Sequence, residues 1–204
     1  MTEDNTVLII AVLAVIASLA AAGFSYYSIS QGPKIAGFAL SSTGTTNLTI
    51  ASTADINFTA TNINWGSGIV NATKAGAVLD SDAGTVINGT WTAVSTPLVL
   101  ENIGNVNVTL TLNSSLAAQF IGAGASYKLK IADKASNTGA CGGTNGFSSY
   151  TDVSGTNQNA CSDFGYIDNR DEIEIDVQLY IPYNAPTGAK GAILTATASA
   201  IPGG

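Results

Sequence analysis

The sequence contains no histidine. Histidine is the usual general base near neutral pH, the commonest metal ligand and the partner of Ser-His and Cys-His nucleophiles. A phosphate-binding loop of the GxxxxGK[ST] type is also missing, and no carboxylate pair stands out as an acid–base couple. We therefore expect a protein that is not an enzyme.

Charged side chains are scarce as well. They make up 10% of the 204 residues, against about 25% in typical soluble domains. The net charge is −7, and the cations after Lys34 are scattered rather than clustered: Lys74, Lys128, Lys130, Lys134, Arg170 and Lys190. Binding to a phosphate backbone needs clustered Lys and Arg. We expect no nucleic-acid partner and a surface hydrated mainly by hydroxyls and amides.

Only two cysteines are present, Cys141 and Cys161. Their spacing is not that of a CxxC pair, and two thiols alone cannot form a structural zinc site. We predict one disulfide that closes a loop of about 20 residues, with a stabilisation of roughly 3 kcal/mol in the chain-entropy model; two unrelated free thiols are the alternative. A disulfide indicates an oxidising compartment, and hence an extracellular or cell-surface location.

The N-terminal region carries no charge from Asn5 to Pro33. Residues 7–24 read VLIIAVLAVIASLAAAGF, which predicts a long hydrophobic helix over residues 1–32. A helix over residues 6–30 would be on the order of 37 Å long, enough to cross a bilayer core of about 30 Å. Gly32 and Pro33 are a suitable stop.

Two interpretations of this helix place it in a membrane. A cleaved secretory signal could use a site at 20–22, but Glu3 and Asp4 stand where a positive n-region belongs. In a permanent anchor, these acids and Lys34 favour an outside N-terminus. That orientation conflicts with the disulfide unless a positively charged leader preceded Met1.

The third interpretation is a helix that is inserted in the membrane first and then packs against copies of itself. Ala14, Ser18 and Ala22 recur every four residues, and so do Ala17 and Ala21. Rows of small residues with this spacing let helix backbones approach closely.

Residues 33–204 change to a period of two. Asn107–Leu112, for example, alternates polar and apolar side chains, which is typical of a strand with one buried face. We predict an all-β antiparallel Ig-like sandwich. Its strands are expected at 35–40, 47–51, 56–61, 69–73, 86–93, 98–102, 107–112, 126–132, 173–181 and 192–198, with a single helical turn within 115–121.

The Gly-rich stretch 139–165 is interpreted as a surface excursion pinned by the disulfide, because it is too polar to form core. The aromatic residues of this stretch are Phe147, Tyr150 and Phe164, and Tyr166 follows directly after it. They either contact a neighbouring molecule or ligand, or lie against the sandwich.

Six N-x-S/T sequons begin at Asn47, Asn57, Asn71, Asn88, Asn107 and Asn113. They make N-glycans the only attached groups we expect. The acids at 80–82 and 163–176 are oxygen ligands of the kind that calcium prefers. They lack the spacing of a calcium loop, so we expect no bound metal and no cofactor.

An acidic start, a long apolar helix and a Thr- and Asn-rich sandwich together resemble the archaeal type IV pilin and archaellin superfamily. In that family the helices bundle in a filament core and the β domains lie outside. Glu3 or Asp4 is similar to the glutamate that in many bacterial pilins is thought to pair with a neighbour's amino group. Residues 98–112 and 181–198 resemble instead the sandwich of TasA-like and archaeal bundling-pilus subunits. That resemblance implies assembly by donor-strand exchange, with 28–42 as the donor.

These observations lead us to expect a pilin-like structural subunit of an extracellular homopolymeric filament, used for adhesion or motility. Its partners would be copies of itself, the membrane before assembly, and a surface or host-cell ligand. The alternatives are a membrane-tethered Ig-like adhesin or cell-envelope protein, and a donor-strand filament subunit.

Overall fold

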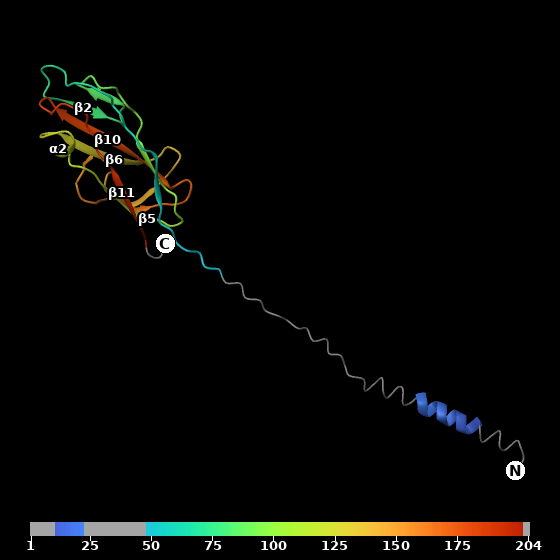
Figure 1. The fold of residues 1–204 in the computed structure, drawn as a ribbon. Helices are drawn as coiled ribbons and strands as arrows, with labels where there is room; N and C mark the ends of the chain where they lie inside the picture. Colours follow the sequence, from blue (N-terminus) through green and yellow to red (C-terminus); the bar gives the residue numbers. More distant parts are fainter. Residues whose placement is uncertain (1–10, 23–47, 202–204) are drawn as a thin grey trace, which may run out of the picture. The chain divides into compact units, whose positions relative to one another are not determined.

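The computed structural model describes residues 11–22 and 48–201 (Figure 1). The chain divides into two compact units, residues 1–49 and 50–204. Several sequence predictions lie outside the described residues: the domain boundary after residue 32, the strand at 35–40, the donor segment 28–42, the acids Glu3 and Asp4, and the sequon asparagine Asn47.

The prediction of a long N-terminal helix is wrong. The described helix covers residues 11–22, which is 12 residues or about 18 Å. All of its side chains are exposed. Most of the stability of a helix comes from packing of an apolar face, and isolated helices shorter than about 12–15 residues are marginal in water. No described helix is long and apolar enough to cross a membrane.

The second unit is a sandwich of two antiparallel sheets. The seven-stranded sheet has the order β1-β4-β10-β2-β3, with β6 and β8 on the other side of β10, and the four-stranded sheet has the order β11-β5-β9-β7. The strands are β1 (Ile56–Ala60), β2 (Gly76–Asp80), β3 (Thr85–Ile87), β4 (Leu98–Asn102), β5 (Val108–Asn113), β6 (Ser126–Asp133), β7 (Cys141–Asn145), β8 (Thr151–Asp152), β9 (Gln158–Phe164), β10 (Glu172–Pro182) and β11 (Thr195–Ala200). One helical turn, α2 (Ala117–Phe120), precedes β6.

A single hydrophobic core fills the space between the sheets. The inward residues of β5 are Val108, Leu110 and Leu112, each at most 1% exposed, and they belong to the same cluster as Leu129 of β6 and Ile173 of β10. The predicted alternation in β5 is therefore confirmed, with the outward positions part-exposed. The all-β, antiparallel part of the fold prediction holds. The Ig-like description does not, because the sheets have seven and four strands, not the four and three or four and five of Ig domains.

Strand β10 is the centre of the larger sheet. On one side it pairs with β6 from Ile173↔Asp133 to Tyr180↔Ser126. On the other side its first half pairs with β4 and its second half with β2. Figure 1 shows β2, β10 and β6 running together in this layer. The predicted strand at 173–181 is confirmed, and it organises three others.

One side of β10 has a gap between the residues that pair with β4 and the residues that pair with β2. Ser81 fills this gap, and its hydroxyl bonds to Asp176. The backbone N–H of Ser81 donates to the Val177 carbonyl (3.0 Å), and the Val177 N–H donates to Ser81 Oγ (2.9 Å). The Ser81 hydroxyl in turn donates to Asp176 Oδ1 at 2.9 Å. Burial raises the pKa of Asp176, which the bond from Ser81 only partly offsets, and repulsion from Asp82 adds to the rise.

Asp80 lies beside this gap, and its pKa is shifted in the opposite direction from that of Asp176. Its Oδ1 accepts hydrogen bonds from the Ala83 N–H (3.0 Å) and the Tyr150 hydroxyl (2.7 Å), and its Oδ2 accepts one from Gln178 Nε2 (2.8 Å). Burial raises the pKa of Asp80, but these hydrogen bonds outweigh it, so that the pKa lies below its ordinary value. Residues 81–84 form the connection between β2 and β3.

Other predictions from the pattern failed. Residues 48–51 form no strand, and the predicted strand at 69–73 is reduced to an isolated bridge between Val70 and Gly89. Strand β2 was missed because its GAVLD sequence is a continuous apolar run rather than an alternating one: it is buried on both faces.

We predict opposite effects for two conservative substitutions in the gap. Asp176→Asn should raise the free energy of unfolding at pH 7, because it removes a buried charge and keeps an acceptor for Ser81. Asp80→Asn should lower it by about 1–3 kcal/mol, because one amide oxygen replaces a carboxylate that accepts from three donors.

The pH dependence of urea unfolding checks the signs. The contribution of Asp80 is present above the unfolded pKa of about 3.9 and is lost as the pH falls through its lower folded pKa. The cost of Asp176 is present above its raised folded pKa and is relieved as the pH falls. The gain from Asp176→Asn should therefore shrink on acidification. Equal signs for the two variants at pH 7 would contradict this account.

Candidate functional site

Every side chain of helix 11–22 is exposed. Its large residues Val12, Leu13, Val15, Ile16 and Leu19 are 50–68% exposed. The predicted helix-packing residues Ala14, Ala17, Ser18, Ala21 and Ala22 all lie within this helix. The Ser18 hydroxyl donates to the Ala14 carbonyl at 2.7 Å. The Ser18 hydroxyl thus has a partner within the helix, and every other side chain of the helix is apolar.

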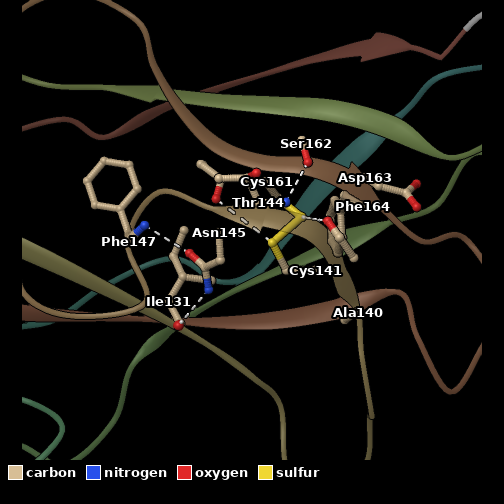
Figure 2. The surroundings of a disulfide bond; sticks show 12 residues. Ile131, Ala140, Cys141, Thr144, Asn145, Phe147, Cys161, Ser162, Asp163 and Phe164 are labelled. Atoms are coloured by element: carbon tan, nitrogen blue, oxygen red, sulfur yellow. Dashed lines mark hydrogen bonds between the residues drawn. A yellow bond between two sulfur atoms is a disulfide. The ribbon is translucent and has the colours of Figure 1, made fainter.

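The disulfide Cys141–Cys161 is confirmed. It joins β7 to β9, which are neighbours in the four-stranded sheet, with Cα atoms 5.4 Å apart (Figure 2). Cys161 is fully buried, and Ser162 Oγ accepts a hydrogen bond from the Thr144 N–H at 2.7 Å beside it. The disulfide therefore fastens an edge strand to its sheet.

The stretch 139–165 is not a surface excursion, contrary to the prediction. It forms β7, β8 and β9, and its Phe147, Ala160 and Phe164 are core residues at 0–1% exposure. The polar, Gly-rich composition suggested a surface loop, but glycines in this stretch allow backbone conformations and close backbone contacts within the sheet. Gly143 has φ +69°, and a Cβ on Gly146 would lie 2.1 Å from the Asn159 carbonyl oxygen.

Asn145 links the two sheets next to the disulfide. Its Nδ2 donates to the Ile131 carbonyl on β6 (3.1 Å), and its Oδ1 accepts from the Phe147 N–H (2.9 Å), as Figure 2 shows. The Ile131 N–H donates to the Phe147 carbonyl at 2.7 Å. Phe147 is thereby fixed in the core, which leaves it unable to contact a ligand.

The acidic groups form no metal site in the part of the chain that the structure describes. Asp82 forms an ion pair with Lys130, whose ammonium lies 5.7 Å from the centre of the Tyr150 ring. Burial, together with the hydrogen bond to Asp80, raises the pKa of Tyr150 well above its ordinary value. Tyr150 is thus a neutral donor in a structural cluster.

Five of the six sequon asparagines are described. Asn57 and Asn71 are exposed, whereas Asn88, Asn107 and Asn113 are partly buried. The amide of Asn107 donates to Asp163 Oδ1 at 2.7 Å, and that of Asn113 donates to Asn157 Oδ1. The sequons thus divide into freely accessible amides and amides engaged in the fold.

A groove of about 1300 Å³ was not anticipated from the sequence. It is lined by strands of the seven-stranded sheet, by α2 and by the connecting segments 61–70 and 185–194. Both tryptophans of the chain, Trp65 and Trp91, line it. Gly68 was the one residue of this region that could have pointed to the groove. The Trp91 ring packs so closely on it that a Cβ at position 68 would lie 2.4 Å from the ring.

Comparison of the chain with protein-family models, with curated proteins and with solved structures finds no match. Three features of the chain itself bear on its function: the exposed apolar helix, the disulfide-fastened sandwich and the groove.

We predict that the double variant Cys141→Ala/Cys161→Ala remains folded but loses about 3 kcal/mol of unfolding free energy, the loop-closure value for a loop of this length. Guanidinium unfolding measures the loss. Reduction of the native chain should produce a similar loss, and the double variant should not respond to reductant. A native chain whose stability is unchanged by complete reduction would contradict the prediction.

Proposed function

We propose that the chain is a structural subunit of an extracellular homopolymeric filament, in which the apolar helices of neighbouring copies cover one another. The observation that carries the proposal is helix 11–22, a helix without a polar face and with every side chain exposed. Such a helix is normally buried. The small residues recurring every four positions suit contact with like helices.

The sandwich fits the outer part of such an assembly. Its low charge and its many hydroxyls and amides give a hydrated coat, and the disulfide suits an oxidising exterior. The alternative of an adhesin that displays 139–166 has less support, because Phe147 and Phe164 are core residues and the Tyr150 hydroxyl is bound to Asp80.

Substituting larger residues for the small residues of the helix distinguishes a role in helix packing from a role in membrane tethering. Ala14→Leu and Ala17→Leu keep the helix apolar, so membrane association should persist. Close helix contact should be lost, and the mass of sheared filaments seen by electron cryo-microscopy should fall at least about tenfold. Val12→Ile and Leu13→Ile, which change bulky positions, are the matched controls. If native surface material yields only monomers, and only after detergent is added, the chain is a tethered surface module instead.

Glycan occupancy is expected to follow the state of the asparagine amides. In material from the native host, Asn57 and Asn71 should carry glycans more fully than Asn107 and Asn113, whose amides donate hydrogen bonds within the fold. Mass spectrometry of peptides before and after deglycosylation measures the occupancy. Full modification of Asn107 and Asn113 with bare Asn57 and Asn71 would refute this ranking.

A further inference from the structure

The groove lies on a part of the seven-stranded sheet that the smaller sheet leaves uncovered. Its lining includes residues from β1, β2, β4, β6 and β10, and none from the strands of the four-stranded sheet. Phe58 of β1, Leu98 of β4 and Ile181 of β10 line it as half-buried side chains. Leu98 pairs with Ile175, and Ile181 lies six residues further along β10. At about 3.4 Å per residue, the lining runs roughly 20 Å along β10, so the groove is elongated.

The size and the lining of the groove favour a long hydrocarbon chain over a compact ligand. At about 1300 Å³, the groove exceeds the roughly 300–1,000 Å³ of typical small-molecule sites. Trp65 and Trp91 line it with half-buried rings. Ile69, Tyr183 and Ile193 also line it and are 67–82% exposed. Exposed apolar patches of this kind mark interaction sites, and this one requires an occupant with much apolar surface of its own.

The charges around the groove favour an anionic group at the end of that chain. The protein has a net charge of −7, yet none of the acidic residues in the described domain lines the groove. Lys190 is the one charged residue among the described residues that do, and it is exposed. An anion beside Lys190 would keep its contact with water, so it avoids the cost of burying a charge. The lining therefore matches an amphiphile with a hydrocarbon chain and one anionic head.

The segment around Lys190 can move to admit such a ligand. Within the described domain, the backbone of residues 186–192 makes no hydrogen bond to another backbone group. A Cβ on Gly188 or Gly191 would meet no atom within 4 Å, so the segment is not closely packed at either glycine. Moving it outward therefore breaks no backbone hydrogen bond.

We infer that the groove binds a long-chain carboxylate of the fatty-acid type, with its hydrocarbon chain along β10 and its carboxylate at Lys190. The inference does not depend on the proposed filament, because a filament subunit and a tethered surface module could each carry this site. Burial of the hydrocarbon chain contributes about fourfold in affinity per methylene, whereas a single exposed ion pair contributes little. Chain length should therefore affect the affinity more than the head group does.

Quenching of tryptophan emission by a brominated fatty acid tests the site. Both tryptophans of the chain line the groove and helix 11–22 contains none, so quenching reports the groove even if the apolar helix also binds lipid. With purified full chain prepared without detergent, dibromostearate should quench the emission saturably, at about one ligand per chain. Palmitate should reverse the quenching, and laurate, which is four methylenes shorter, should be needed at an at least about tenfold higher concentration.

Opposite charges introduced at one exposed position of the lining supply the second readout. Ile193→Lys should tighten the binding of palmitate about threefold, and Ile193→Asp should weaken it by a similar factor. Hexadecanol, which carries no charge, should bind to both variants alike. The residue is 82% exposed, so neither variant should change the melting temperature. Ile87→Lys and Ile87→Asp are the matched controls, because Ile87 is 53% exposed and does not line the groove.

Two results would overturn the inference. Absent quenching, or quenching that rises with dibromostearate without saturating, would show that the groove holds no fatty acid. Equal changes in palmitate affinity for Ile193→Lys and Ile193→Asp would show that no carboxylate lies at this part of the groove. Neither result bears on the filament proposal, whose readout is the mass of sheared filaments.

Discussion

Strand β10 is the constraint on which the rest of the sandwich depends. It is eleven residues long, it pairs with three strands, and its inward side chains at Ile173, Ile175, Val177 and Leu179 are at most 5% exposed. At about 25 cal/mol per Å² of apolar surface, burial of side chains of this kind is worth roughly 1.5–3 kcal/mol each. A one-residue slip of β10 would turn this face to solvent, so the register of β2, β4 and β6 follows from it.

Sharing one side of β10 between two strands creates the polar gap at Ser81 and Asp176. The backbone of β10 would be left unpaired there without the Ser81 side chain, which accepts from the Val177 N–H. Buried carboxylates are costly unless they are well hydrogen-bonded, and the two acids of this region differ in that respect. Asp80 has three donors, while Asp176 has Ser81 alone among the described residues. The ionised carboxylate of Asp80 therefore stabilises the fold, whereas that of Asp176 destabilises it.

The unequal size of the two sheets leaves apolar surface that the sandwich cannot cover by itself. Helix 11–22 likewise carries exposed large apolar side chains. A chain with 10% charged residues has little means to make such surfaces soluble. In the proposed filament, like helices of neighbouring copies would cover the apolar side chains of helix 11–22.

Much of the fold could be predicted from local pattern. Alternation identified β5 and the long strand β10. Two cysteines in a chain without histidine led to one disulfide. These features are local in sequence or limited by composition, so they need no knowledge of the partner strands. The candidate filament function follows from the apolar N-terminal run in the same way.

Tertiary structure decided the remainder. The long apolar run gives a described helix of 12 residues, because helix length depends on packing partners and not on hydropathy alone. The stretch 139–165 contributes Phe147, Ala160 and Phe164 to the core. The backbone of Asn159 comes so close to Gly146 that a Cβ there would clash, which composition cannot reveal. The groove arises from how many strands each sheet recruits, which is set by pairings between residues far apart in the chain. The sequence by itself determined which faces are apolar. Only the tertiary structure decided which of those faces stay exposed, because burying an apolar face requires a second surface that packs against it.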